Sequence, residues 1–157
     1  MKILITGGKT VTALKLTKAF EGSEVVLGDY GDIPSIATNA YSFVALGVWN
    51  ADVLAHNLLT KCLDYGVDML VPLYEAEINA LAKSLVLFEE FGLNVLLPAN
   101  PVYKSVKVTD WLVFDNGKLL YSTSENNLDL ALQATLNGVY AIDAETKKLS
   151  LVSITNP

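Results

Sequence analysis

The chain is 157 residues long, carries a formal net charge of −6, and combines 52% hydrophobic with 18% charged residues. This length suits one domain with a real core, and the apolar surplus predicts a buried sheet and a homodimer interface. The chain contains no arginine. A nucleic-acid binder needs a basic face, so we expect no nucleic-acid partner. No apolar run reaches the roughly 18 residues that span a bilayer, so we expect no membrane insertion.

Two reactive residue types occur once each. Cys62 is the only cysteine, which excludes an internal disulfide and predicts a reducing, cytoplasmic location. It falls among apolar residues of a predicted helix, so an inert core thiol is the favoured interpretation. His56 is the only histidine, and without a second His or Cys it has no partners for a zinc site.

Short strands and helices alternate through the first hundred residues. Apolar runs predict strands at residues 2–6, 24–28, 41–46, 69–71 and 93–97. Helical periodicity predicts helices over residues 10–20, from a cap at Asn50 or Asp52 to Tyr65, and over 75–91. The inward positions of these helices include Val11, Leu14, Val53, Leu63 and Val86. This alternation is typical of an α/β fold with a Rossmann-like, doubly wound, mostly parallel sheet.

The pattern changes after Pro98. Asp115-Asn116-Gly117 between two apolar runs predicts a β-hairpin. A helix is expected over residues 124–136 and a second hairpin about residues 145–148. We therefore divide the chain into a Rossmann-like domain, residues 1–100, and a small antiparallel extension, residues 101–157.

The first predicted strand leads into a glycine turn, Gly7-Gly8-Lys9-Thr10. A dinucleotide fingerprint needs G-x-G-x-x-G, and only adjacent glycines are present here, although Ala13 is small enough for the third position. The turn still directs backbone N–H groups and a helix N-terminus toward the end of the sheet. Two interpretations stay open: an anion site that uses Lys9 and Thr10, or a purely structural bend.

Three further candidates follow other strands. Asp29 ends the second strand, where an acidic side chain binds ribose hydroxyls in nucleotide-binding sheets; the alternative is a solvated carboxylate. Tyr74 and Glu75 begin the helix after the strand at 69–71 and face the glycine turn if that strand pairs with the first. Glu75 and Glu77 also suit a helix N-terminus on electrostatic grounds alone, and this interpretation is favoured.

Residues 2–99 resemble the N-terminal, pre-ATP-grasp domain of ATP-grasp ligases, the superfamily of carbamoyl-phosphate synthase and D-alanine–D-alanine ligase. The resemblance rests on "ITGG…ALKL", on Val71, Pro72 and Glu75 before a helix, and on "VLLPA" after it. In that superfamily the domain contributes to the acceptor-substrate surface and precedes a large ATP-binding region. The residues after Pro98 are too few for that region.

The end of the chain is similar to a late ATP-grasp stretch that closes with Glu-x-Asn-Pro. Asn156-Pro157 match its end, but Ile154 stands where the family has a glutamate that binds Mg²⁺-ATP. One asparagine does not replace the carboxylates that Mg²⁺ requires. No metal site is therefore expected, and ATP with Mg²⁺ would bind only with a partner chain.

These observations predict a stand-alone domain, non-catalytic by itself, that binds a small carboxylate or phosphate metabolite or a protein partner. The predicted contacts are Gly7, Gly8, Lys9, Thr10, Asp29, Tyr74 and Glu75. One alternative is a component of a split ATP-grasp carboxylate–amine ligase whose ATP-binding part lies on another chain. The other alternative is a nucleotide- or NAD-binding Rossmann domain.

Overall fold

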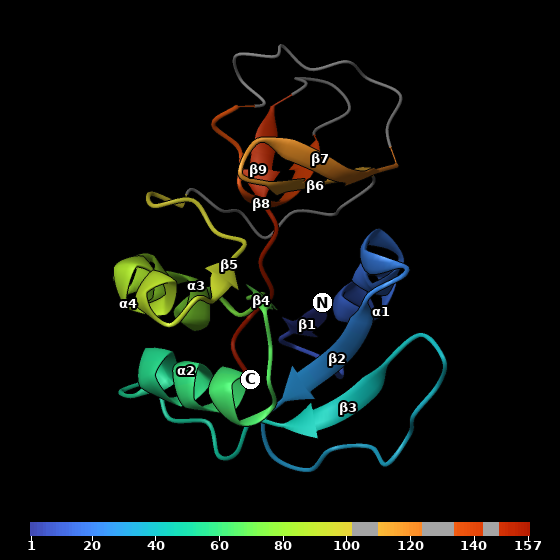
Figure 1. Cartoon of the computed structure of the whole chain (residues 1–157), viewed down its shortest axis with the longest axis vertical. Coiled ribbons are helices and arrows are strands. Elements are labelled where there is room, and N and C mark those ends of the chain that lie inside the picture. Colours follow the sequence, from blue (N-terminus) through green and yellow to red (C-terminus); the bar gives the residue numbers. More distant parts are fainter. Residues whose placement is uncertain (102–109, 124–133, 143–147) are drawn as a thin grey trace.

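The first sheet has five parallel strands in the order β3-β2-β1-β4-β5 (Figure 1). The computed structural model describes residues 1–101, 110–123, 134–142 and 148–157. The strands are β1 (Lys2–Ile5), β2 (Glu24–Asp29), β3 (Ser42–Ala45), β4 (Met69–Val71) and β5 (Asn94–Val95). The predicted parallel sheet is therefore confirmed. The chain proceeds from β1 to β2 and β3 on one side of the sheet, and from β4 to β5 on the other. The segments that follow β1 and β4 therefore diverge at the carboxyl ends of these strands.

Helices fill the predicted places with different boundaries. They are α1 (Val11–Leu16), continued by the 3₁₀ turn η1 (Thr17–Phe20), then α2 (Leu54–Asp64), α3 (Glu75–Ala82) and α4 (Leu85–Glu90). Five apolar side chains that we expected inside are exposed: Val11, Leu14, Val53, Leu63 and Val86. These helices are short and cover the sheet with a narrow face, so an apolar residue off that face stays in solvent.

The single long helix predicted over residues 75–91 is wrong, because it is broken between α3 and α4. Ser84 leaves the helical conformation at φ −126° and ψ 13°, and its hydroxyl donates to the Ala80 carbonyl. Such a side-chain bond competes with the helical ladder. The change of direction lets Phe88 become fully buried while Val86 points outward.

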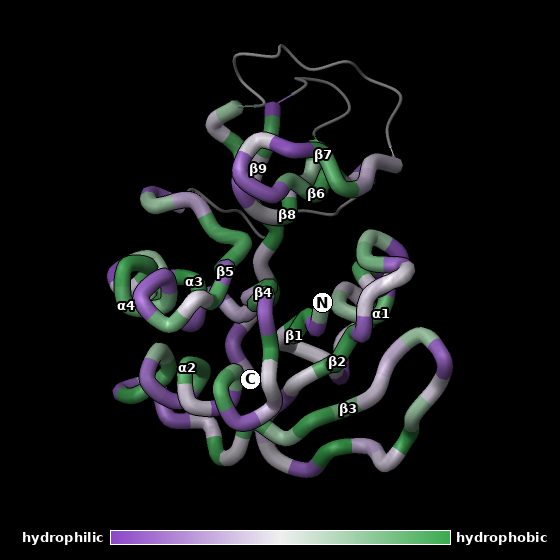
Figure 2. Tube along the Cα trace, viewed as in Figure 1, coloured by the Kyte–Doolittle hydropathy of each residue, from purple (hydrophilic) through white to green (hydrophobic). Residues whose placement is uncertain are grey.

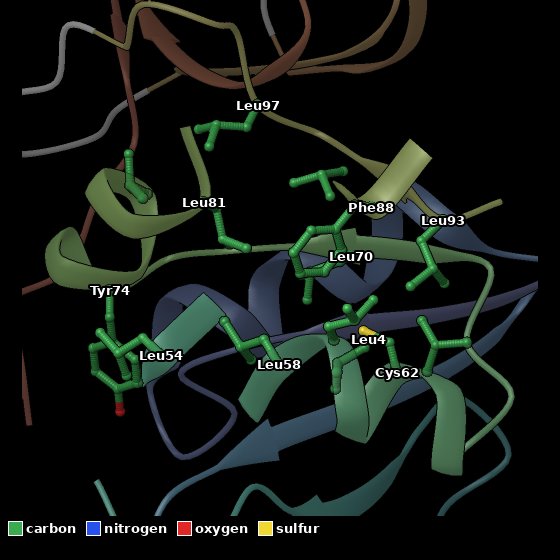
Figure 3. Close-up of a cluster of buried hydrophobic side chains, with 14 of the residues drawn as sticks. Leu4, Leu54, Leu58, Cys62, Leu70, Tyr74, Leu81, Phe88, Leu93 and Leu97 are labelled. Carbon is green, nitrogen blue, oxygen red and sulfur yellow. The ribbon is translucent and has the colours of Figure 1, made fainter. Parts of the chain in front are cut away.

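Each face of the first sheet has its own apolar cluster. On one face, α2, α3 and α4 cover Leu4 and Leu70, and Figure 3 shows Leu58, Cys62 and other side chains of this cluster. On the other face, Ile3, Ile5 and Val71 pack against α1 and against strands from the end of the chain. β2 is buried from Val25 to Asp29, as a strand covered on both faces requires, whereas the edge strand β3 is only partly covered although Figure 2 shows it as largely hydrophobic.

A second, antiparallel sheet has four strands in the order β7-β6-β8-β9. They are β6 (Asp110–Asp115), β7 (Lys118–Ser122), β8 (Gly138–Ile142) and β9 (Leu149–Leu151). Asn116 and Gly117 both have positive φ, 45° and 86°, as a tight hairpin turn requires. The first predicted hairpin is confirmed, and so is the pairing of the strands of the second. The helix predicted at 124–136 falls mostly outside the described residues, and so do residues 145–147 of the second predicted hairpin turn.

This second sheet contributes to both core clusters of the first, because Leu112, Phe114 and Tyr140 pack in the cluster covered by α2, α3 and α4. Trp111, Val113, Val139 and Ala141 share a core cluster with β1, β4 and α1. The apolar side chains of this segment that a dimer interface is expected to use are Trp111, Leu112, Phe114 and Tyr121, but the first three are buried within the chain. The homodimer itself stays a prediction.

The chain returns to the first sheet after β9. The C-terminal segment, residues 152–157, leaves the second sheet and runs past β4 toward the C-terminus (Figure 1). Val152 N–H still donates to Val139 in the second sheet, whereas Ile154 forms a parallel bridge with Tyr74 after β4. The last six residues therefore connect the two sheets at the carboxyl end of the first.

Candidate functional site

The residues that follow β1, β2 and β4 meet at the carboxyl ends of these strands. We call this the carboxyl-edge site and define it by the glycine turn Gly7–Thr10, Asp29, Tyr30, Tyr74 and Glu77. β1 pairs with both β2 and β4, so the ends of all three strands lie next to one another. The glycine turn, Asp29 and Tyr74 therefore lie next to one another, as expected.

The glycine turn is held by contacts within the protein. Gly7 has φ +64°, and a Cβ on Gly8 would lie 2.8 Å from the backbone of Leu27, so both positions require glycine for structural reasons. The N–H of Gly8 donates to Gly28 at 2.9 Å, and the N–H of Thr10 donates to Gly7 at 2.9 Å. Thr10 also caps α1 with its hydroxyl, which accepts from the N–H of Ala13.

Asp29 is buried and accepts three hydrogen bonds. Its Oδ2 accepts the Lys9 N–H at 2.9 Å, and its Oδ1 accepts the Tyr30 N–H at 2.8 Å and the Tyr74 hydroxyl at 2.7 Å. The Lys9 N–H, which an anion bound to the glycine turn would use, is therefore already hydrogen-bonded to Asp29. Ribose hydroxyls would have to displace these same bonds to reach Asp29.

Lys9 and Glu75 lie at the outer side of the site. Lys9 is exposed, and its Nζ donates to the Tyr30 carbonyl at 2.8 Å. Glu75 is half-buried, and its backbone N–H donates to Ile154 at 3.1 Å. Of the seven predicted contacts, Lys9 and Tyr74 thus bond directly to Asp29. Gly7 and Thr10 bond to each other, and Gly8 bonds to Gly28. Glu75 is joined to the C-terminal segment instead.

Glu77 is fully buried at the third position of α3. Its Oε1 accepts the Thr6 hydroxyl at 2.6 Å and the Tyr74 N–H at 3.2 Å, and its Oε2 accepts the Tyr30 hydroxyl at 2.6 Å. The bond to Tyr74 is the backward half of a capping box. Burial raises the pKa of Glu77 to about 7, against the lowering effect of these three bonds. This residue gains and loses its proton near neutral pH.

Three aromatic rings pack against one another beside Asp29 and Glu77. Tyr30 and Tyr74 lie 6.0 Å apart, and the Trp49 ring stands edge-on to both, at 4.8 Å from Tyr30 and 5.5 Å from Tyr74. Burial and the nearby carboxylates raise the pKa of both tyrosines well above the usual range. Both phenols therefore stay protonated and act as hydrogen-bond donors to Glu77 and Asp29.

The C-terminal segment lies over this site. Ile154 N–H donates to Leu73 at 2.8 Å, and Glu75 N–H donates back to Ile154. A Cβ on Gly7 would stand 2.5 Å from the Ile154 Cδ1, so the isoleucine side chain lies directly on the glycine turn. Asn156 Oδ1 then accepts the Ala76 N–H at 2.9 Å at the start of α3. Side-chain oxygens at helix starts satisfy otherwise unpaired N–H groups in this way.

Cysteine and metal-ligating residues add no further reactive centre in the described part of the chain. Cys62 is buried, and burial raises the pKa of its thiol to about 12, as an inert core thiol requires. Within the described ranges, no group of three or more His, Cys, Asp or Glu residues is arranged to hold a metal ion. None of the helices in the described part of the chain is long and apolar enough to cross a membrane.

Comparison with models of known protein families gave no match, and comparison with curated protein sequences gave none either. The resemblance to pre-ATP-grasp domains therefore stays a prediction.

Sequence reasoning missed four participants in the site. Tyr30 and Trp49 lie in predicted loops, and nothing in their local pattern indicates that they face inward. Glu77 was recognised only as a favourable charge at a helix start, although Glu at the third helical position is the available signal for a capping box. From the sequence, Ile154 is only a departure from a motif, because its contact with Tyr74 joins segments 80 residues apart.

Proposed function

We propose that this chain is a non-catalytic binding module of the Rossmann-like, pre-ATP-grasp type, and that its carboxyl-edge site binds an extended segment of a protein partner. One observation carries the proposal: the site already holds an extended peptide segment, Ile154 to Asn156, by two main-chain bonds and one side-chain bond. Main-chain pairing supplies affinity in such recognition, and side chains between the bonds supply specificity.

The same geometry disfavours a small anion. Three N–H groups of the glycine turn donate to acceptors within the protein, and one of these acceptors is the carboxylate of Asp29. Glu77 is also buried beneath the start of α3. A phosphate or carboxylate would meet the negative charge of Asp29, and that of Glu77 when it has lost its proton, in a poorly solvated place, which is costly. We instead expect the partner segment to place an apolar side chain where Ile154 lies on the glycine turn. Two residues later it should carry a side-chain amide that accepts the Ala76 N–H, as Asn156 does.

The experiment uses the full-length chain and a peptide with the sequence of residues 152–157, VSITNP. Ile154→Asp puts a charge where the isoleucine packs against apolar neighbours, so the C-terminal segment of this variant should leave the site. Isothermal titration should then detect peptide binding to Ile154→Asp and at least tenfold weaker binding to the original chain. A VSDTNP peptide should bind neither protein.

Thr155→Asp is the matched control, because it adds the same charge at an exposed neighbouring position. This variant should behave as the original chain does. Circular dichroism checks that Ile154→Asp stays folded. Equal binding of both peptides would contradict the proposal, and so would micromolar binding of Mg²⁺-ATP, for which we expect nothing tighter than about millimolar affinity.

A further inference from the structure

A cavity of about 520 Å³ lies away from the carboxyl-edge site, where α4 and β5 meet the second sheet. One side is formed by α4 and by residues 92–99 around β5, and the other by the turns that contain Asn116 and Asn137. In Figure 1, α4 and β5 lie below the second sheet, so this cavity belongs to the junction of the two sheets. Its volume suits a small organic molecule.

Asp115 fixes the orientation of two amides that line this cavity. Its Oδ1 accepts from Asn94 Nδ2 and from Asn116 Nδ2, each at 3.0 Å. Since an ionised carboxylate only accepts hydrogen bonds, each amide must turn its NH₂ group toward Asp115. The amide oxygens of Asn94 and Asn116 are therefore directed away from Asp115, and neither accepts a hydrogen bond from the residues that the structure describes.

Asn137 is already committed to the protein. Its Nδ2 donates to the carbonyls of Val95 at 3.3 Å and Leu97 at 3.2 Å, and its Oδ1 accepts the Asn116 N–H at 3.1 Å. This side chain fastens the second sheet to the strand β5 and its continuation. The Asn137 side chain therefore forms a fixed part of the cavity wall, and its NH₂ group already donates to protein carbonyls.

The remaining charged group on the wall is a carboxylate. Glu89 lines the cavity from α4, and the described lining residues include no lysine or histidine. The wall also carries the apolar side chains of Leu85, Leu93, Val95, Leu97 and Pro98, and the hydroxyl of Thr135. The cavity thus offers two oriented amide oxygens and one negative charge beside an apolar surface.

We propose that this cavity binds a small organic cation with several N–H donors and an apolar chain, such as a primary ammonium or guanidinium compound. The N–H groups donate to Asn94 Oδ1 and Asn116 Oδ1, and the positive charge lies near Glu89. Hydrogen bonds to charged partners are shorter and stronger than neutral ones, and methylene groups cover the apolar wall. An anion of the same size would lie beside the negative charge of Glu89.

Agmatine is a suitable probe, because it carries a guanidinium and an ammonium group on a four-carbon chain. Two-dimensional NMR of the full-length protein should show saturable shifts of the Asn94 and Asn116 side-chain amide signals on agmatine addition. Butyrate and n-butanol, which keep a four-carbon chain without the cation, should shift these signals at least tenfold less at equal concentration.

Glu89→Gln should weaken agmatine binding about three- to tenfold, because it removes the negative charge but keeps the shape of the side chain. Glu90→Gln is the matched control, since Glu90 is the next residue of α4, is exposed and does not line the cavity. Equal weakening by both variants would show only general attraction to a protein of net charge −6 and would overturn the proposal. Binding of butyrate as tightly as agmatine would overturn it too.

Discussion

The Tyr30 hydroxyl donates a 2.6 Å hydrogen bond to Glu77 Oε2 in the interior of the protein, although the two residues are 47 positions apart. The same tyrosine donates its backbone N–H to Asp29. One residue thus connects the two buried carboxylates of the carboxyl-edge site. The protonation of Glu77 should therefore affect the stability of the whole site.

We predict that stability falls as pH rises from about 4.5 to about 7. The pKa of Glu77 is 4.5 in the unfolded chain and about 7 in the folded protein, so the folded state binds the proton more tightly within this range. Unfolding then becomes easier as this proton is lost. The original chain should lose up to about 3 kcal/mol of its free energy of unfolding over this pH range, since each unit of pKa shift corresponds to about 1.4 kcal/mol. Glu77→Gln should abolish this loss.

Urea unfolding at pH 4.5, 6 and 8 measures this effect. Glu75→Gln is the control, because Glu75 precedes Glu77 on α3 by two positions but is only half-buried. Glu75→Gln should leave the slope of stability against pH close to that of the original chain. A Glu77→Gln slope equal to the original slope would contradict the prediction.

A second prediction concerns the bond from the Tyr74 hydroxyl to Asp29 Oδ1, at 2.7 Å. Tyr74→Phe leaves a buried carboxylate with one donor fewer, so we expect a loss of about 1–3 kcal/mol in the free energy of unfolding. Tyr41→Phe is the comparison, because Tyr41 is less buried and packs edge-on against Phe43. It should cost under about 0.5 kcal/mol. Equal costs for the two variants in urea unfolding would show that the Asp29 bond does not contribute.

The parallel sheet and the first hairpin were predictable because their signals are local. Alternating apolar runs marked the strands, and Asp115-Asn116-Gly117 marked a turn with two positive φ angles. The break at Ser84 had no comparable signal, since the helical periodicity continues through it. The break accompanies the burial of Phe88, a tertiary contact that local periodicity does not encode.

The carboxyl-edge site was only half predictable for a related reason. Asp29 and Tyr74 follow strands, and the rule for parallel sheets places such residues together. Glu77 and Ile154 enter the site through contacts across more than 70 residues of sequence, with Thr6 and with Tyr74. A glutamate is also rarely buried without a cation beside it, so its sequence position alone favours an exposed helix start.

The homodimer expected from the apolar composition gives a third prediction. Large apolar side chains stay exposed on and beside α4, namely Val86, Leu87 and Phe91, so we place the interface there. Light scattering should give twice the chain mass of 17.0 kDa, and Phe91→Ser should raise the dissociation constant at least tenfold. Val11→Ser, on the exposed side of α1, should leave it unchanged. A mass of 17.0 kDa at high protein concentration would contradict the dimer.

The last prediction tests the contact between the glycine turn and the C-terminal segment. Gly7→Ala places a Cβ 2.5 Å from the Ile154 Cδ1, at a position with φ +64°. The positive φ alone costs about 1–2 kcal/mol, and the clash adds to it. In an Ile154→Ala background the clash is absent, so Gly7→Ala should cost about 1 kcal/mol less there than in the original chain.

Gly22→Ala is the matched control for this double-mutant cycle. Gly22 also has a positive φ, +88°, but no atom lies within 4 Å of the Cβ that it would gain. Its cost should be the same in both backgrounds, because only backbone strain is involved. If Gly7→Ala shows no coupling to Ile154→Ala either, the C-terminal segment does not lie on the glycine turn in solution. The peptide-binding proposal for the carboxyl-edge site then loses its basis.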